Sequence, residues 1–239
     1  MKKKIAAGAT LIEDLVAGSR ILAQHGVLDA YGHISARSDK RPEHFIMSRS
    51  RAPALVTAAD LMELDADSES LRGETRKGFI ERYIHGEIYR TRPDVMAVVH
   101  SHSPSVIPFG VTKTKLRPVY HMGSFLWTGA PVWDIRQVKA DNDVLVRDRP
   151  LGAALASTLG SCTCVLMRGH GMTVVGDSIQ EAVFRAIYTE MNARLQLQAE
   201  QLEGPIQFLS ESEGKGSTAS NRGTLERPWE LWKKAALRA

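Results

Sequence analysis

The chain contains little cysteine: only Cys162 and Cys164 occur among its 239 residues. Two cysteines cannot form the set of several disulfides that stabilises many small secreted domains. They stand two apart in "SCTCVLM", a strand-like run in which both side chains lie on one face. We interpret them as buried structural thiols, with metal binding by the pair as the alternative.

Long apolar runs are also missing from the sequence. No segment approaches the roughly eighteen uninterrupted apolar residues that a membrane-spanning helix needs. The opening "MKKKIAAGATLIEDLVAG" is similar to the start of a signal peptide, but Glu13 and Asp14 interrupt its apolar stretch. We therefore expect no membrane partner and a cytoplasmic location.

Charge of one sign is in small excess, because 31 Lys and Arg against 27 Asp and Glu give a net charge of +4. The basic residues are scattered, and no stripe of interleaved basic and aromatic side chains indicates a nucleic-acid groove. Apolar residues make up 43% and charged residues 24%, as in ordinary globular proteins. We expect one folded α/β domain with no nucleic-acid partner.

The spacing of apolar residues predicts helices and strands in turn along the chain. The last predicted helix begins with a capping box in which Ser178 and Glu181 take the two reciprocal positions. An apolar strand runs up to His100. The other predicted strands lie at 32–38, 44–48 and 162–176, the last range holding two, and one more strand follows a loop in each of 52–67 and 117–135. The predicted helices lie at 11–28, 77–90, 149–160 and 178–202.

The end of the chain differs in composition from the rest. Residues 210–223, "SESEGKGSTASNRG", are polar and rich in Gly and Ser, which predicts a mobile linker. The following "LERPWELWKK" has Trp229 and Trp232 at helical spacing, and these side chains are costly to leave in water. We therefore divide the chain into a main domain, 1–209, and a linker with a C-terminal tail, 210–239.

Two histidines end the apolar run in "MAVVHSHSPS". Because side chains of a strand alternate between its faces, His100 and His102 point the same way, a few ångströms apart. Two imidazoles placed in this way can bind one metal ion. The alternative is that they are unrelated polar residues at a strand end.

A third histidine, His170, lies in "RGHGM", where glycines on both sides allow a tight turn that presents the imidazole outward. Three imidazoles with an open fourth position are typical of a catalytic metal site. Taken alone, His170 could also be a turn residue without a ligand.

Glu81 and His85 are four residues apart on the predicted helix and therefore share a face. A carboxylate near an apolar stripe and a metal can act as a general acid/base, with its pKa raised by burial. The alternative is a surface glutamate paired with a cation next to Arg82.

The segments "GHIS", "E-x-x-x-H", "RPDVMAVVHSH" and "RGHGM", in this order, resemble the class II aldolase/adducin family. The resemblance implies a three-layer α/β/α fold around a mostly antiparallel sheet, assembled as a homotetramer. It implies that His100, His102 and His170 bind a divalent metal ion and that Glu81 is the acid/base. It also places His121 where family aldolases have a catalytic tyrosine loop.

Departures from the family's sugar-phosphate aldolases indicate the substrate. Where those enzymes hold phosphate with hydroxyl groups, this chain has "SRSRAP", "GHIS" and "GFIE". Guanidinium groups bind carboxylates through two hydrogen bonds, and Phe and Ile offer a flat apolar wall. The segments are most similar to the family's decarboxylase branch, which acts on hydroxylated pyridine or benzene dicarboxylates. The expected substrate-binding residues are His33, Arg49, Arg51, Phe79 and, from the C-terminal tail of a neighbouring subunit, Arg227.

We therefore expect a metal-dependent, non-oxidative decarboxylase of a small aromatic carboxylate. The expected cofactor is Zn²⁺ or Mn²⁺, with Fe²⁺ or Co²⁺ as alternatives. A retro-aldol lyase is the alternative reaction because it uses the same metal to stabilise an enediolate, and an Fe(II) oxygenase on this scaffold is another. A non-enzymatic module like adducin is disfavoured because adducin-type heads lack the metal histidines.

Overall fold

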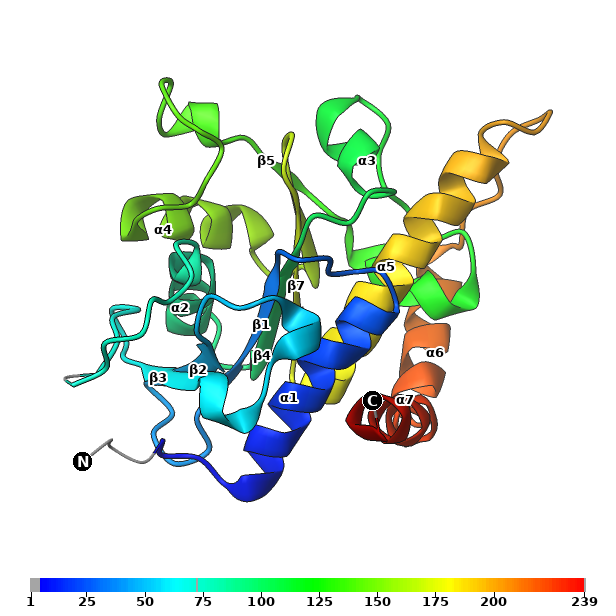
Figure 1. The fold of residues 1–239 in the computed structure, drawn as a ribbon. Helices are drawn as coiled ribbons and strands as arrows, with labels where there is room; N and C mark the ends of the chain where they lie inside the picture. Colours follow the sequence, from blue (N-terminus) through cyan, green and yellow to red (C-terminus); the bar gives the residue numbers. More distant parts are fainter. Residues whose placement is uncertain (1–4, 72, 239) are drawn as a thin grey trace.

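A computed structural model describes residues 5–71 and 73–238 of the chain. Seven strands form one sheet in the order β3–β2–β1–β4–β7–β6–β5, and every neighbouring pair is antiparallel except β5 with β6 (Figure 1). The mostly antiparallel sheet is therefore confirmed. The strands are β1 (His33–Arg37), β2 (Phe45–Ser48), β3 (Leu61–Leu64), β4 (Ala97–Ser101), β5 (Val132–Trp133), β6 (Cys164–Met167) and β7 (Gly171–Gly176).

Helices pack on both faces of this sheet (Figure 1). Strand β4 lies in its middle and contributes to a hydrophobic core on each side, Val99 to one and Val98 to the other. His100 is two residues beyond Val98 and therefore faces the same side. The core with Val99 is built with α1 (Ala9–Gln24) and α5 (Ile179–Ala199), and the core with Val98 with α2 (Arg82–Thr91) and α4 (Arg149–Leu159).

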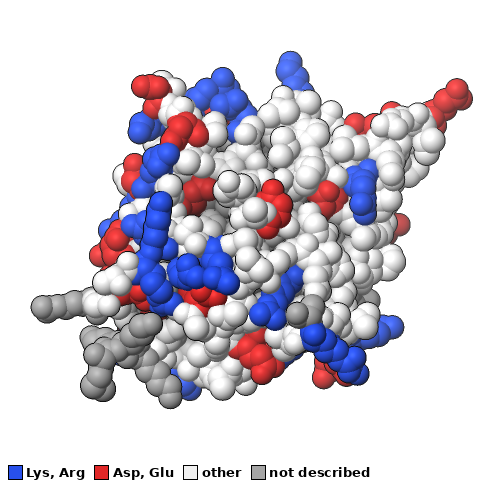
Figure 2. All heavy atoms as spheres, in the orientation of Figure 1, with Lys and Arg blue, Asp and Glu red and all other residues white. Residues whose placement is uncertain are grey.

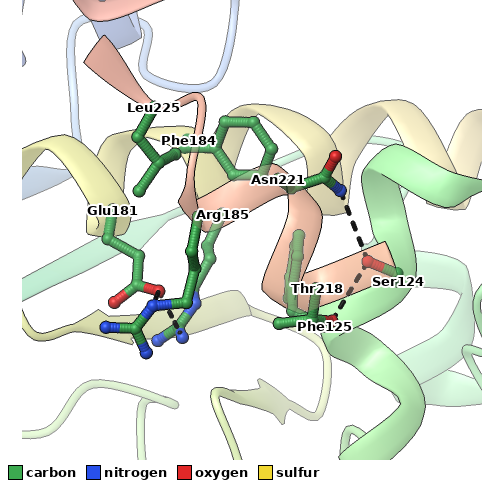
Figure 3. Close-up of a pocket in the computed structure, with 9 residues that line it drawn as sticks. Ser124, Phe125, Glu181, Phe184, Arg185, Thr218, Asn221 and Leu225 are labelled. Carbon is green, nitrogen blue, oxygen red and sulfur yellow. Dashed lines mark hydrogen bonds and ion pairs between the residues drawn. The ribbon is translucent and has the colours of Figure 1, made fainter. Parts of the chain in front are cut away.

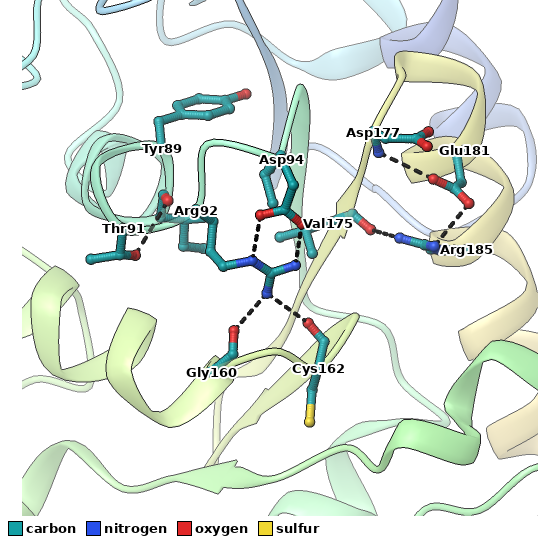
Figure 4. A network of polar contacts seen from close by, with 12 residues as sticks. Tyr89, Thr91, Arg92, Asp94, Gly160, Cys162, Val175, Asp177, Glu181 and Arg185 are labelled. Carbon is teal, nitrogen blue, oxygen red and sulfur yellow. Dashed lines mark hydrogen bonds and ion pairs between the residues drawn. The ribbon is translucent and has the colours of Figure 1, made fainter. Parts of the chain in front are cut away.

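A network of charged side chains closes the end of the sheet where β4 begins, opposite the end that carries His100 (Figure 4). Arg92 pairs with Asp94 at 2.7 Å, and Arg185 pairs with Glu181 at 2.8 Å. Both arginines also donate hydrogen bonds to main-chain carbonyls, namely those of Gly160, Cys162 and Val175. The network thus ties α5 to the strands it covers.

Of the two hydrogen bonds in the capping box predicted for α5, one forms and the other does not. Ser178 Oγ accepts the backbone N–H of Glu181 at 3.1 Å, as expected. The Glu181 carboxylate instead accepts the backbone N–H of Asp177, at 3.1 Å, and it pairs with Arg185. With these two partners, the Glu181 carboxylate does not accept the backbone N–H of Ser178 that a capping box requires.

Residues 210–223, predicted as a mobile linker, instead form a helix, α6 (Glu211–Arg222), with its own capping box. The helix packs on η3 (His121–Thr128), where Thr218 Oγ1 and Ser124 Oγ lie 3.1 Å apart (Figure 3). A Cβ at Gly214 would lie 2.5 Å from the Trp127 side chain. The linker prediction is wrong because these small residues form a close-packing helix face that resembles a linker in composition.

The C-terminal tail is a helix, α7 (Glu226–Arg238), that packs on α1 of the same chain. Trp229 is buried, and the Trp232 ring lies 5.0 Å from the ring of His25. Lys233 pairs with Asp14 at 2.7 Å. Both tryptophans are therefore accommodated within their own chain.

Three further features concern the cysteines, the apolar character of the helices and the surface charge. Cys164 is buried in β6, Cys162 is half-buried, and both are free thiols. Among the described helices, which also include α3 (Ile107–Val111), none has the length and apolar character needed to cross a membrane. Figure 2 shows Lys and Arg side chains intermixed with Asp and Glu on the face in view.

Candidate metal centre and active site

Four side chains meet at the end of β4, on the face that carries α2. The possible ligand atoms of Glu81, His100, His102 and His170 all lie within 4.8 Å of one another. Nε2 of His102 is 3.1 Å from Nε2 of His170, and Oε2 of Glu81 is 3.4 Å from Nε2 of His100. The fold thus brings together the three histidines that the sequence singles out and adds Glu81 to them.

Glycines allow the turn between β6 and β7 to bring His170 beside β4. Gly169 has φ = 66°, a left-handed conformation that side chains disfavour. A Cβ at Gly171 would lie 2.0 Å from the carbonyl oxygen of Ser101. Any other residue there would push the turn away from the strand.

Hydrogen bonds fix which ring nitrogens face the cluster. Nδ1 of His100 donates to the Met172 carbonyl at 3.1 Å, and Nδ1 of His170 donates to the Val144 carbonyl at 2.7 Å. A carbonyl only accepts, so in each neutral ring Nε2 carries the lone pair. Nε2 of His100 is buried without a hydrogen-bond partner among the described residues. Imidazole donors held in this way fit a divalent cation.

Glu81 immediately precedes α2 and does not lie within the helix as predicted. Its Oε1 accepts the backbone N–H of Val146 at 3.0 Å, which leaves Oε2 directed at the cluster. Burial raises the pKa of Glu81, but its interactions with His100 and His170 lower it more, so it lies well below its usual range. The raised pKa expected from burial is therefore not found.

A cavity of about 360 Å³ opens beside the cluster. Phe79 and Ile80 line it with apolar surface, as expected for an aromatic substrate. Arg51 and Lys77 bring two cations to the same cavity. Its remaining lining comes from Ala30, Tyr31, Gly32, His33, Ser50, Ala52, Gly78, Glu81, His102 and Leu145.

The two predicted arginines occupy different places. Arg51 lines the cavity, and its Nε donates to the Leu55 carbonyl at 2.7 Å. Arg49 does not line it. Arg49 pairs with Asp60 at 2.7 Å, and Nε of Arg51 lies 3.4 Å from the same carboxylate. The sequence did not single out Lys77, although its place two residues before Phe79 in the same loop is a signal that could have found it.

His33 also lines the cavity and is the first of four linked buried side chains. Its Nδ1 lies 2.7 Å from Nε2 of His85, whose Nδ1 is 2.6 Å from Ser35 Oγ. Ser35 Oγ is 2.8 Å from the hydroxyl of Tyr89. Burial lowers the pKa of His85 to about 3 and that of His33 well below its ordinary value, so both rings are neutral.

Two predicted residues lie away from this cavity within one chain. His121 is exposed at the start of η3, where its carbonyl accepts a hydrogen bond from Asn221 of α6 at 2.8 Å. Arg227 is exposed on α7. Neither residue lines the cavity beside the histidines, so any catalytic part they play requires another subunit.

Residues 13–197 match the family model described as Class II Aldolase and Adducin N-terminal domain. Decarboxylase tropJ of Talaromyces stipitatus is 39% identical over 92% of this chain and 92% of its own. A 3,4-dihydroxyphthalate decarboxylase of Arthrobacter keyseri is 33% identical over 84% of this chain and 83% of its own. The solved L-fuculose 1-phosphate aldolase from Glaciozyma antarctica shares the fold, with a TM-score of 0.78 and 22% identity over 99% of this chain and 93% of that one. The chain therefore belongs to the class II aldolase and adducin family.

Proposed function

We propose that this protein is a metal-dependent carbon–carbon lyase that removes carbon dioxide, without oxidation, from a hydroxyaromatic acid carrying a second carboxylate. The observation that carries the proposal is one cavity that combines Arg51 and Lys77, apolar walls, and Glu81 and His102 of the four-residue cluster. Two relatives whose names state a decarboxylase, one of them acting on 3,4-dihydroxyphthalate, support the reaction and the substrate class.

His100, His102 and His170 would hold the divalent cation. We propose Zn²⁺, which imidazole ligands suit, or Mn²⁺, with Fe²⁺ or Co²⁺ as alternatives, because each of these ions can act as a Lewis acid. The bound cation would supply a Lewis acid for the negative charge that develops as carbon dioxide leaves.

The cavity walls would hold the substrate. Phe79 and Ile80 pack against the ring, and Arg51 with Lys77 binds the carboxylate that is not lost. A guanidinium group forms two parallel hydrogen bonds with a carboxylate, whereas an ammonium acts as a point charge. These contacts would orient the departing carboxylate toward the histidines.

Glu81 would move the proton. As a carboxylate, its Oε2 accepts the proton of the substrate hydroxyl. The bond between the ring and the carboxylate then breaks, carbon dioxide leaves, and the electron pair stays on the ring. Glu81 returns the same proton to that ring carbon, so the reaction needs no oxidant or reductant.

We also propose that the chain has the three-layer α/β/α arrangement of its family and assembles as a homotetramer. In that assembly, His121 and Arg227 would reach the site of a neighbouring subunit, since neither lines the cavity of its own chain. Their exposure on η3 and α7 supports this assignment.

An oxygenase is the second candidate because a relative from Streptomyces roseochromogenus, named as a 4-hydroxy-3-prenylphenylpyruvate oxygenase and 4-hydroxy-3-prenylbenzoate synthase, is 30% identical over 62% of this chain. The test supplies the Zn²⁺- or Mn²⁺-loaded protein with 3,4-dihydroxyphthalate, with its analogues lacking one carboxylate, and with L-fuculose 1-phosphate. We expect carbon dioxide from the dicarboxylate at the highest rate, without oxygen uptake. Oxygen uptake in step with carbon dioxide, or faster cleavage of the sugar phosphate, would overturn the proposal.

A further inference from the structure

The four linked side chains His33, His85, Ser35 and Tyr89, here called the histidine relay, join the cavity to the inside of the protein. His33 and Ser35 are two residues apart and share one face of β1. His85 and Tyr89 are four residues apart and share one face of α2. All four are buried, Ser35 and His85 completely. The relay therefore forms where β1 packs against α2.

Only one direction of hydrogen bonding gives the Tyr89, Ser35 and His85 donors an acceptor each. Among the described residues, Ser35 Oγ is the only acceptor within reach of the Tyr89 hydroxyl, and the backbone amide of Val98, which also acts on that oxygen, can only donate. Tyr89 therefore donates to Ser35, and Ser35 donates its own proton to Nδ1 of His85.

The same direction continues to the cavity. Since Nδ1 of His85 accepts, its Nε2 carries the proton and donates to Nδ1 of His33. The proton of the neutral His33 ring is then on Nε2, the nitrogen that no described residue uses. The reverse direction would leave the buried Tyr89 proton without an acceptor, which typically costs about 1–3 kcal/mol.

The relay is suited to fixing an orientation, not to conducting protons. Its inner end is Tyr89, which is 6% exposed and whose hydroxyl is bonded to Ser35 Oγ. Burial raises the pKa of Tyr89 well above its ordinary value, so the hydroxyl keeps its proton. No proton enters the relay from that end.

We propose that Tyr89, Ser35 and His85 are positioning residues that hold His33 in the Nε2–H tautomer, so that His33 donates a hydrogen bond to an anionic oxygen of the substrate beside the metal ligands. His33 is the register partner of His100 across β1 and β4, with ring centroids 5.2 Å apart, so its donor lies next to the cluster. The nature of the oxygen rests on the proposed function, but the tautomer does not.

The first test is nitrogen NMR of zinc-loaded protein labelled with ¹⁵N-histidine and measured without substrate, with His33→Gln used to assign the His33 signals. We expect a protonated Nε2 and an unprotonated Nδ1 for His33. A proton on Nδ1 of His33 overturns the proposal, whatever reaction the protein catalyses.

The second test is a double-mutant cycle of His33→Ala and His85→Phe, in which kcat, KM and zinc content are measured on the substrate that the protein decarboxylates. His33→Ala should lower kcat/KM by about ten- to a hundredfold, as for a lost hydrogen bond to a charged group. His85→Phe should lower it in the wild type but not further in His33→Ala, because it acts through His33. Additive effects would show a structural role and overturn the proposal.

Three further substitutions serve as controls for the cycle. His25→Phe makes the same change at an exposed histidine that does not line the cavity and should leave kcat/KM unchanged. His33→Gln places an amide near the position of Nε2 and should retain more activity than His33→Asn, whose amide reaches only the position of Nδ1. The opposite order of the two amides would contradict a donor at Nε2.

Discussion

Nε2 of His102 lies 3.1 Å from Nε2 of His170, although the two residues are 68 positions apart in the sequence. The Nδ1–H of His170 donates to the Val144 carbonyl, so Nε2 is the ring nitrogen left to face His102. Burial and the neighbouring imidazoles lower the pKa of His102 to about 4, whereas the hydrogen bond and charge of Glu81 outweigh burial and raise the pKa of His170. A shared divalent cation would fit two imidazole nitrogens held this close.

We predict that His100→Ala, His102→Ala and His170→Ala each remove most of the bound metal and of the activity, because the three ligands form one site. Metal content per chain, measured by atomic emission, and oligomer size test this. His25→Phe is the control for loss of a histidine outside the cluster. Full metal content in all three variants would contradict the assignment.

Glu81→Gln should keep most of the metal, since three imidazoles remain, and should lose turnover by about a hundred- to ten-thousandfold, the usual contribution of a general acid/base. Reaction in heavy water should place deuterium on the ring carbon that carried the carboxylate. The exposed Glu43 provides a control variant, Glu43→Gln. If Glu81→Gln loses as much metal as the histidine variants, Glu81 is a ligand and the proton assignment is wrong.

Arg51→Ala should raise KM by about ten- to a hundredfold, because a charge-assisted contact to the second carboxylate is lost. Arg51→Lys should restore little of the binding, since an ammonium cannot form the planar pair of hydrogen bonds. Arg136→Ala is the matched control, because Arg136 is exposed and does not line the cavity. An equal rise of KM for substrates with one and with two carboxylates would contradict this role for Arg51.

Trp229→Ala should lower the free energy of unfolding by about 3–5 kcal/mol, the usual cost of removing a large buried aromatic side chain. Leu231→Ala on the same helix should change it by less than about 0.5 kcal/mol, because Leu231 is 68% exposed. Denaturant unfolding of both variants measures the difference. Similar values for the two variants would mean that α7 does not pack on α1 in solution.

Arg227→Ala distinguishes two possible roles of the C-terminal tail, namely binding substrate in a neighbouring subunit and packing on its own chain. Arg227 is exposed, so its loss should leave stability unchanged. If α7 reaches a neighbouring site, kcat/KM should fall while metal content stays the same. Unchanged kcat/KM would limit the tail to packing on its own chain.

Much of the candidate site could be predicted because its residues obey local rules. The alternation of β4, continued one residue past its end at Ser101, predicts His100 and His102 on one face, and the glycines around His170 mark a turn that approaches a strand. Neither rule shows that the two segments pair in the sheet. The resemblance to a family implied that the three histidines share one site, and the structure shows that β4 pairs with β7.

Other features depend on partners that are distant in the sequence. Arg49 and Arg51 are equivalent in "SRSRAP" and both pair with Asp60, and only the folded structure shows that Arg51 alone of the two lines the cavity. The lowered pKa of Glu81 depends on the two histidines that face it, whereas burial alone predicts the opposite. The small residues of α6 form a packing face because Trp127 lies against Gly214, and the composition of the segment does not predict this contact.

The most direct test of the account is a titration of metal-free protein with Mn²⁺ or Zn²⁺ in the presence of 3,4-dihydroxyphthalate, with carbon dioxide release and oxygen uptake recorded together. We predict that the rate of carbon dioxide release rises in proportion to added metal, reaches a plateau at one ion per chain, and is accompanied by no oxygen uptake. Carbon dioxide release at full rate from the metal-free protein, or none after one ion per chain has bound, would contradict the account.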